Sequence, residues 1–296
     1  MIYAIGVGGD ATFTHFVAEA ERAGAPVVAI DLREVVAERG WRLAIPDDGH
    51  SVLPTPSGRH ELDPRASYFC RLIDLAALQD DPRHAVAWQS LVTGLTAWLD
   101  HIPGLVVNRA GSDNGAKPLH EWSIAQAGFA VPESLTSSDG ARLGAFAAAG
   151  PTIVKAVSGV RATSRLVGPG DFAGFDSRQG PVHVQRYVTG ADVRAHVVGD
   201  RVHAERIISP VVDYRAAPAG EVGFSLCELP GPLADRMTAC TRDFGLAFAG
   251  WDLKVADDGT HWCLEVNPMP GYDWYDRRLG GAVTRSLLTL LEEGAA

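Results

Sequence analysis

The chain has 296 residues, which at roughly 100–200 residues per domain corresponds to two or three compact units that can bury a sizeable core. With 46% hydrophobic and 21% charged residues, its composition is that of an ordinary globular protein and excludes a fibrous, disordered or disulfide-stapled chain. The 26 basic and 36 acidic residues give a net charge of −10, without the basic footprint of a nucleic-acid-binding protein, so we expect no nucleic-acid partner.

The first segment of the chain alternates strand and helix signals. We expect a buried strand over residues 2–7, a glycine turn at 6–10, an amphipathic helix over 11–23 and a second strand over 26–31. This βαβ pattern favours a parallel sheet. The turn lacks the third glycine of the dinucleotide-binding fingerprint, but Asp31 follows the glycines by about 20 residues, as the ribose-binding acid of a Rossmann fold does. An NAD-dependent oxidoreductase therefore stays open as an alternative.

The rest of the chain continues to mix helices and strands. Prolines and glycines between residues 45 and 64 indicate loops around a short hairpin. Periodicity then predicts strands over 67–73, 105–108, near 131 and over 152–157, and helices over 83–99, 118–127, 139–149 and 281–293. From residue 186 onward, several strands alternate polar and apolar side chains. We expect an α/β protein with α+β character in its C-terminal half, divided into units at 1–104, 105–185 and 186–296.

Cysteine usage and hydropathy bear on the cellular compartment. The four cysteines contain no C-x-x-C pair, which indicates a reducing environment and neither a zinc knuckle nor a disulfide framework. No basic residue precedes Arg22, and no apolar run reaches the ~18 residues of a membrane span. We therefore expect a cytoplasmic protein without a membrane partner.

Lysine is rare in this chain. Only Lys117, Lys155 and Lys254 occur among the 26 basic residues. An ammonium is a compact point charge that suits a phosphate oxygen in a tight pocket, whereas a guanidinium is larger and forked. Unless the three lysines are retained by chance, they mark positions where arginine cannot serve.

The most informative segment is a hairpin formed by residues 251–255 and 262–268 around a turn at 257–259. Period-2 alternation places Asp252 on one face of the first arm, and Glu265 and Asn267 on one face of the second. A two- or four-residue loop pairs Asp252 directly with Glu265, and two carboxylates that close repel unless a cation neutralises them. With the Asn267 carbonyl as a third oxygen, this set suits Mg²⁺. The alternative is that these residues form a solvated polar face of the hairpin. A three-residue loop would break the register, so that Asp252 and Glu265 would no longer be paired.

The pattern Asp-x(12)-Glu-x-Asn-Pro at 252–268, preceded by Lys117 and Lys155, resembles the ATP-grasp superfamily. Within it, the chain is most similar to the RimK-type glutamate ligases and the microviridin-type (graspetide) peptide ligases. The matching stretches appear in family order between about residues 105 and 280, at 131–136, 155–159, 185–188, 190–194 and 264–268. The resemblance implies an ATP-grasp fold, in which two antiparallel sheets hold ATP, with an N-terminal Rossmann-like pre-ATP-grasp domain. The three units then become this domain, a central lid and a C-terminal subdomain with the magnesium site.

The resemblance also implies a nucleotide-binding set and a metal-binding set. The implied ATP-binding residues are Lys117 and Lys155 at the phosphates, Ser158 and Gly159 in a small-residue lid, Gln185, Arg186, Tyr187 and Val188 in the hinge that reads the adenine edge, and Asp192 at the ribose. The implied ligands of Mg²⁺, or of Mn²⁺, are Asp252, Glu265 and Asn267. The family commonly has an acid where this chain has Arg186, a departure that affects adenine contacts of the side chain but not of the main chain. The alternative for Asp192 is a turn residue after Gly190.

Three arginines are implied to act on the reacting acyl group. Arg194 and Arg206 match basic positions near the γ-phosphate and the acyl phosphate, and Arg215 belongs to an Asp-aromatic-Arg element of the peptide-cyclising branch. A transferring phosphoryl group needs positive charge at its equatorial oxygens, which a planar guanidinium supplies. In a chain with 23 arginines, a surface position is the alternative for each of them.

Together these inferences predict an ATP- and Mg²⁺-dependent ligase. We expect it to activate a substrate carboxylate as an acyl phosphate and to join it to an amine or hydroxyl, forming an amide or ester. The expected partners are a peptide or amino-acid-like carboxylate substrate and that acceptor, and a homodimer is left open. Besides the oxidoreductase, the alternative is a nucleotide-binding module without chemistry.

Overall fold

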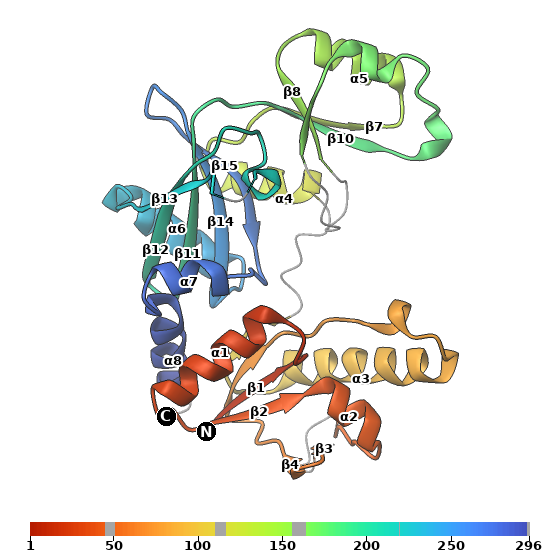
Figure 1. Cartoon of the computed structure of the whole chain (residues 1–296), viewed down its shortest axis with the longest axis vertical. Coiled ribbons are helices and arrows are strands. Elements are labelled where there is room, and N and C mark those ends of the chain that lie inside the picture. Colours follow the sequence, from red (N-terminus) through yellow and green to blue (C-terminus); the bar gives the residue numbers. More distant parts are fainter. Residues whose placement is uncertain (45–50, 110–116, 156–163, 219, 295–296) are drawn as a thin grey trace.

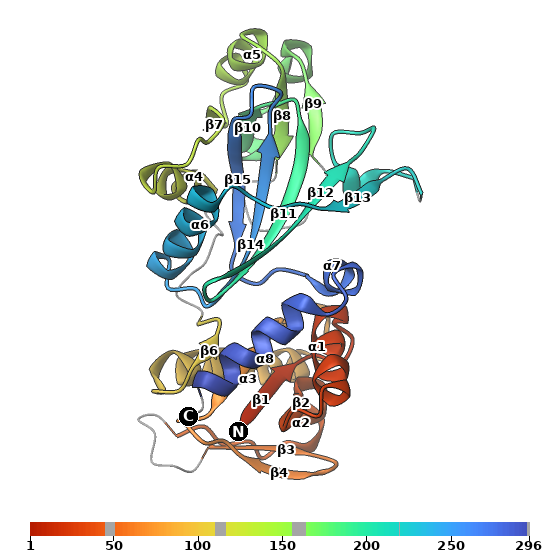
Figure 2. The same ribbon diagram turned by 90° about the vertical axis from the view of Figure 1, so that its left-hand side faces the viewer.

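The computed structural model describes residues 1–44, 51–109, 117–155, 164–218 and 220–294. Figure 2 shows three layers stacked along the long axis, with the N-terminal layer below, a large twisted sheet in the middle and a small sheet with its helix above. Both ends of the described chain lie beside each other in the N-terminal layer (Figure 1). The last helix therefore returns to the layer in which the chain begins.

The N-terminal layer is built on a parallel four-stranded sheet. Its strands, in spatial order, are β2 (Val27–Asp31), β1 (Ile2–Gly6), β5 (Ser67–Cys70) and β6 (Val106–Val107). Ile2 and Ala4 point to one face of β1, and Tyr3 and Ile5 to the other, and all four are buried. A sheet that is apolar on both faces needs helices on both sides.

The helices of this layer come from both ends of the sequence. The face with Tyr3 and Ile5 packs against α2 (Leu32–Glu38) and α3 (Pro82–His101), whereas α1 (Ala11–Arg22) and α8 (Ala282–Gly294) cover the face with Ile2 and Ala4. A small hairpin is formed by β3 (Val52–Thr55) and β4 (Gly58–Glu61). Because α8 shares one apolar core with α1 and β1, the C-terminal chain is fixed to the first layer.

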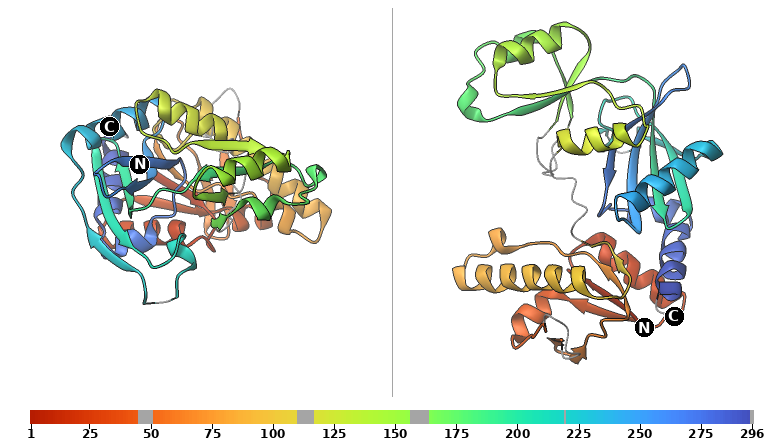
Figure 3. Two further views of the ribbon diagram at one scale, coloured as in Figure 1. Left: turned by 90° about the horizontal axis from the view of Figure 1, so that it is seen from above. Right: turned by 180° about the vertical axis from the view of Figure 1, so that it is seen from behind.

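Two antiparallel sheets form the remainder of the molecule. The small sheet has the order β7 (Ser134–Ser137), β10 (Val182–Arg186), β8 (Thr152–Lys155) and β9 (Arg165–Val167). The large sheet has the order β13 (Gly223–Leu226), β12 (Arg201–Ile208), β11 (Ala191–Val198), β14 (Phe248–Val255) and β15 (His261–Asn267). Figure 3 shows the two sheets from above and from behind.

Each antiparallel sheet carries its own helices on one face. The small sheet packs its core against α5 (Gly140–Ala148) and η2 (Pro169–Phe172), and the large sheet against α4 (Lys117–Gln126) and α6 (Gly231–Asp243). The short α7 (Asp273–Arg278) follows β15, and three more 3₁₀ turns are η1 (Ala76–Leu78), η3 (Ser177–Gln179) and η4 (Tyr214–Ala216). The opposite face of the large sheet also carries α7, whose Arg278 binds Glu205 of β12.

The structure differs from the sequence-based division of the chain at three points. The strand expected over 105–108 pairs with β5 and therefore belongs to the first sheet. Helix α4, expected in the central unit, buries Ile124 among Trp251 and other residues behind the large sheet. The strand expected near residue 131 begins only at Ser134, while Ala130 makes a single bridge to Trp262. All three differences are tertiary contacts that local periodicity does not encode.

No helix among the described residues is both long and apolar enough to cross a membrane.

Candidate active site

A cavity of about 950 Å³ lies between the small sheet, the large sheet and the N-terminal layer. Most of the site residues expected from the sequence line it, namely Lys117, Lys155, Gln185, Arg186, Tyr187, Val188, Asp192, Arg194, Arg215, Asp252, Glu265 and Asn267. Ser158 and Gly159 lie outside the described residues. Arg206 does not line the cavity. This cavity therefore brings together most of the predicted site residues, which are spread from Lys117 to Asn267 in the sequence.

The two acidic residues of the hairpin face each other as expected. Asp252 on β14 pairs directly with Glu265 on β15. The register then shifts by one residue toward the turn, so that Leu253 pairs with Cys263 and Lys254 with Trp262. The loop therefore has an odd number of residues, unlike the expected two or four, and the bulge is what brings Asp252 opposite Glu265.

Each carboxylate of this pair is bound by a cation from another element. Arg194 Nη1, on the neighbouring strand β11, donates to Asp252 Oδ1 over 2.8 Å, and Lys117 Nζ lies 3.6 Å from Glu265 Oε1. Arg194 is only 6% exposed, so the Asp252 carboxylate stabilises a buried positive charge. The amide oxygen of Asn267 accepts from the backbone N–H of Met269 over 2.9 Å.

The donor set at this place suits a hard divalent cation. Two opposed carboxylates and one amide oxygen provide oxygen ligands only, as Mg²⁺ and Mn²⁺ prefer. In the described parts of the chain, no group of three or more His, Cys, Asp or Glu side chains could hold a metal ion. An ion at Asp252 and Glu265 would therefore need further oxygens, and Mg²⁺ usually takes these from water and from substrate phosphates.

The second phosphate-type lysine lies at the end of the small sheet. Lys155 is the last residue of β8 and pairs across the sheet with His183. Burial lowers the pKa of its ammonium, while the carboxylates of Glu121 and Glu265 act in the opposite direction. No ion pair of Lys155 Nζ occurs among the residues that the structure describes. A partly buried ammonium without an ion-pair partner among these residues is suited to receive an anionic ligand.

The third lysine also contributes to the cavity. Lys254 Nζ donates to Asp192 Oδ1 over 3.0 Å and lies 5.8 Å from the centre of the Tyr187 ring. Burial raises the pKa of the Asp192 carboxyl, although Lys254 opposes this shift. Asp192, expected at the ribose, is therefore oriented by Lys254, for which no motif predicted a role.

The hinge residues divide into structural and accessible groups. The backbone N–H of Arg186 donates to Glu133 O over 2.8 Å, and that of Tyr187 donates to Pro151 O over 2.9 Å. The Arg186 guanidinium donates to Phe146 O over 2.7 Å and lies 3.8 Å from the centre of the Phe146 ring on α5. This side chain fastens α5 to the hinge, which gives a structural reason for an arginine at this position. Val188 lines the cavity beyond these bonded amides.

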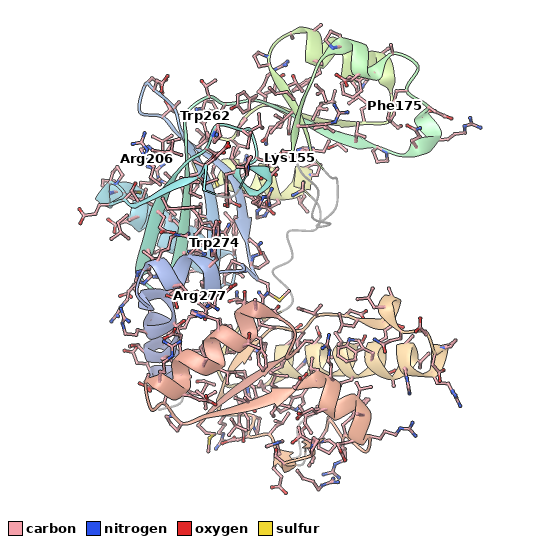
Figure 4. The ribbon with its side chains drawn as sticks, in the orientation of Figure 1. Lys155, Phe175, Arg206, Trp262, Trp274 and Arg277 are labelled. Carbon is pink, nitrogen blue, oxygen red and sulfur yellow. The ribbon has the colours of Figure 1, made fainter. Side chains whose placement is uncertain are left out.

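Arg206 corrects a sequence-based expectation. On β12 it pairs with Val193, whereas Glu205 pairs with Arg194. Directly paired residues share a face and neighbours along a strand alternate, so Arg206 points away from the face that carries Arg194. Figure 4 shows Arg206 on the large sheet, well away from Lys155. Arg206 is exposed and takes no part in the cavity.

Arg215 lies at the exposed rim of the same cavity. Its guanidinium binds the Asp213 carboxylate through two hydrogen bonds, of 2.7 and 2.8 Å, and its side chain remains 60% exposed. Asp213 also accepts from the backbone N–H of Ser164 over 3.2 Å. The neighbouring Tyr214 hydroxyl is bonded to that of Tyr275, near Arg194. Asp213 thus holds the Arg215 guanidinium in a fixed position beside the buried part of the site.

Sequence reasoning missed the residues that hold these groups in place. In α4, His120 Nε2 accepts from the backbone N–H of Val266 over 3.0 Å. The Glu121 carboxylate accepts hydrogen bonds from His183 and Gln185 of β10 in the small sheet. Lys117, His120 and Glu121 are spaced i, i+3 and i+4, a helical signal that could have revealed this polar side of α4.

The N-terminal layer contributes another missed contact. Arg71 Nη1 donates to the carbonyl oxygens of Met269 and Pro270 over 3.0 and 3.1 Å, while its Nη2 binds Asp10 over 2.7 Å. The segment after Asn267 is therefore fixed to the first layer. No local pattern in the sequence could have indicated this contact.

Comparisons with known proteins identify the fold. No protein-family model and no curated protein matches the sequence. Among solved structures, the chain is similar to the ATP-grasp ligase PsnB complexed with minimal precursor, Mg and ADP, with a TM-score of 0.78 and 24% identity over 98% of each chain. It is also similar to the macrocyclase MdnC bound with precursor peptide MdnA from Microcystis aeruginosa MRC, with a TM-score of 0.81 and 16% identity over 98% of each chain. D-alanine–D-alanine ligase from Bacillus anthracis matches with a TM-score of 0.61 and 17% identity, over 99% of this chain and 96% of that one. The chain has the ATP-grasp fold that its motifs predicted.

Proposed function

We propose that this chain is an ATP- and Mg²⁺-dependent ligase that joins a peptide carboxylate to an amine or hydroxyl. The observation that carries the proposal is the meeting of Lys117 and Lys155 with the Asp252–Glu265 pair in one cavity of about 950 Å³. Two partly buried cations and two opposed carboxylates are what a magnesium-bound triphosphate needs.

The nucleotide would lie between the two antiparallel sheets. Lys117 and Lys155 would bind phosphate oxygens, Val188 would offer its backbone to the adenine edge, and Asp192 would accept from the ribose hydroxyls. Asp252, Glu265 and Asn267 would hold Mg²⁺, which neutralises phosphate charge when it is bound. We place Ser158 and Gly159 at the phosphates on the family resemblance alone.

The proposed reaction has two displacements. A carboxylate oxygen of the substrate attacks the γ-phosphorus, and ADP leaves as the bond to the bridging oxygen breaks. The acceptor nitrogen or oxygen then attacks the acyl carbon, loses its proton and expels inorganic phosphate. Arg194, buried beside Asp252, supplies positive charge near the transferring group. No covalent bond to the protein is required.

A peptide is the substrate class that we favour. The similar structures are described as PsnB complexed with minimal precursor and MdnC bound with precursor peptide MdnA. In this chain, Arg215 presents a half-exposed guanidinium at the rim of the cavity, where an acidic peptide could reach it. This supports a role for Arg215 in contacting the acyl donor.

Several finer features belong to the same proposal. We propose that the N-terminal layer is a Rossmann-like pre-ATP-grasp domain and that a central lid and a C-terminal subdomain follow, with strand β6 assigned to the first unit. Free thiols at all four cysteines support a reducing cytoplasmic location. A homodimer is compatible with this function. Asp31 caps α2 by accepting from the backbone N–H of Arg33 over 2.9 Å, which accounts for its position without NAD.

Two measurements test the proposal. Thermal unfolding should shift upward with ATP and Mg²⁺ and stay unchanged with NAD. Incubation with ATP, Mg²⁺ and an acidic precursor peptide encoded beside this gene should release ADP and yield a peptide lighter by one water per bond formed. A shift with NAD alone would support the oxidoreductase instead, and nucleotide binding without ADP release for any carboxylate substrate would support a non-catalytic module.

A further inference from the structure

The Arg194 guanidinium is held by the protein at two of its three nitrogen atoms. Besides the bond from Nη1 to Asp252, its Nε donates to His196 Nε2 over 3.4 Å. His196 lies two residues further along β11, on the same face of the large sheet, and is 1% exposed. Arg194 lines the cavity, and its Nη2 has no hydrogen bond among the described residues. The third nitrogen is therefore left for a ligand.

The space beside this guanidinium depends on a glycine. Gly250 on β14 pairs directly with His196, next to the pair formed by Arg194 and Asp252. A Cβ atom at position 250 would lie 2.2 Å from Arg194 Nη2 and 2.6 Å from the Cβ atom of Pro270, which is closer than non-bonded atoms approach. The absence of a side chain at Gly250 therefore lets the guanidinium lie over this strand, between the imidazole and the carboxylate.

The surroundings of His196 keep its imidazole neutral. The ring lies among those of Phe248, Tyr272 and Tyr275, with centroid distances of 6.1, 6.4 and 5.1 Å. Burial lowers the pKa of His196 well below its ordinary value, and the charge of Arg194 acts in the same direction. A neutral imidazole has one donor and one acceptor nitrogen, whereas a guanidinium can only donate. Nε2 is therefore the acceptor, and Nδ1 carries the proton.

We propose that His196 is a positioning residue that fixes the plane of the Arg194 guanidinium for phosphoryl transfer. The inference rests on the proposed function, which places Arg194 near the transferring group. Bonds at Nε and Nη1 together fix the plane of the guanidinium, whereas the bond to Asp252 alone would let it rotate. A donor that is already oriented needs no reorganisation when charge develops on the phosphoryl oxygens. His196 does not line the cavity, so it acts only through Arg194.

The first test uses the wild-type protein without nucleotide. The ¹⁵N chemical shifts of a histidine ring show which nitrogen carries the proton, and His196→Gln identifies the resonances because it removes them. We expect the proton of His196 on Nδ1 at pH 7, with Nε2 unprotonated. A proton on Nε2 would overturn the inference, because that nitrogen could then not accept from Arg194. This measurement requires neither turnover nor a stable variant.

The second test compares two substitutions of His196 by steady-state ADP release with an acidic precursor peptide. His196→Leu removes the acceptor and should lower kcat at least about tenfold, while the KM for ATP changes by less than about twofold. His196→Gln offers Oε1 as an acceptor and should restore kcat to within about threefold of wild type. The matched control is His203→Leu, which should change kcat by less than about twofold. His203 is paired with His196 across β11 and β12, but its Nε2 is bonded to the Ser286 hydroxyl of α8 over 2.9 Å. Thermal unfolding, measured in parallel, reports whether each variant is folded.

A double substitution distinguishes positioning from a general structural role. If His196 acts through Arg194, His196→Leu should lower kcat by less than about twofold further in an Arg194→Ala background. Losses that multiply in the double variant would overturn the inference, and so would a kcat of His196→Gln as low as that of His196→Leu.

Failure of the proposed function has a different signature. A wild-type protein that releases no ADP with any carboxylate substrate would reject that function and, with it, this role of His196. The ring ¹⁵N shifts would then still report whether Nε2 accepts from Arg194. An active wild-type protein whose variants fail the comparisons above would reject only the role of His196.

Discussion

Asp252 and Glu265 are directly opposed across β14 and β15, and each carboxylate is held by a different cation. Arg194 binds Asp252 from the neighbouring strand, and Lys117 approaches Glu265 from the first turn of α4. A divalent ion between the carboxylates would take over part of this neutralisation. The guanidinium and the ammonium would then be available for phosphate oxygens, which links metal binding to nucleotide binding.

Removing either carboxylate should abolish ligation but affect stability unequally. Asp252→Asn and Glu265→Gln should each lower ADP release at least about 100-fold, because one oxygen ligand and its charge are lost. Asp252→Asn should also lower the free energy of unfolding by about 1–3 kcal/mol, since buried Arg194 loses its partner. Urea unfolding and ADP release measure the two effects. Turnover that survives both substitutions with unchanged Mg²⁺ dependence would exclude this metal site.

The charge at position 155 should not be replaceable by arginine. Lys155→Arg should lower ADP release nearly as much as Lys155→Ala, at least about tenfold, because a forked guanidinium cannot occupy the place of a compact ammonium at the end of β8. Arg142→Lys on the exposed surface of α5 is the matched control and should change the rate by less than about twofold. A fully active Lys155→Arg protein would reduce the scarcity of lysine to a feature of composition.

The two arginines on neighbouring strands should behave differently. Arg194→Ala should lower kcat by about 100-fold, because its guanidinium lies beside the proposed metal site. Arg206→Ala should change kcat by less than about twofold, because Arg206 points to the opposite face. Steady-state ADP release measures both. Equal losses in the two variants would mean that Arg206 reaches the reacting groups after all.

Stability at low pH should depend on Glu121. Burial by itself raises the pKa of Glu121, but hydrogen bonds from His183 and Ser134 outweigh it and lower the pKa in the folded chain. Ionised Glu121 therefore stabilises the fold above its unfolded pKa of about 4.3, and this contribution is lost as pH falls through the folded value. At pH 7, Glu121→Gln should lower the free energy of unfolding by about 1.5–3 kcal/mol. The difference from wild type should shrink as the pH falls below about 4. A difference that stays constant from pH 7 to pH 3 would contradict this assignment. Glu133→Gln serves as the control, because its carboxylate binds Arg186 at the surface and is 66% exposed.

Local periodicity predicted the right carboxylate pair for an incomplete reason, and long-range contacts account for most of what it did not predict. The pairs beside the turn, such as Val255 with His261, would place Asp252 opposite Leu264, and only the bulge next to Leu253 brings Asp252 opposite Glu265. Arg206 could also have been placed correctly: Val198 pairs with Arg201 across a two-residue turn, and that register puts Arg206 opposite Val193. Glu121 and Arg71 differ, because their partners lie 62 and 199 residues away, and no local rule brings them together. The ordered motifs were enough to predict the fold class. They did not predict residues such as Glu121 and Arg71, which hold the site residues in place.

The substrate class can be tested at the rim of the cavity. Arg215 is held by Asp213 with 60% of its side chain exposed, so Arg215→Ala should leave the fold and the nucleotide affinity unchanged within about twofold. If Arg215 contacts the acyl donor, the same variant should raise the KM for an acidic precursor peptide about tenfold, because a charge-assisted hydrogen bond is lost. Arg178→Ala, which removes an exposed arginine that is likewise paired with the carboxylate two residues before it, is the control and should change neither constant.

Mass spectrometry of the wild-type product then distinguishes two reactions: loss of one water per bond indicates cyclisation within the peptide, whereas a gain equal to an added amino acid indicates intermolecular transfer. ADP release driven only by a small non-peptidic acid would reject the peptide substrate, and it would leave the acyl-phosphate chemistry of the site standing.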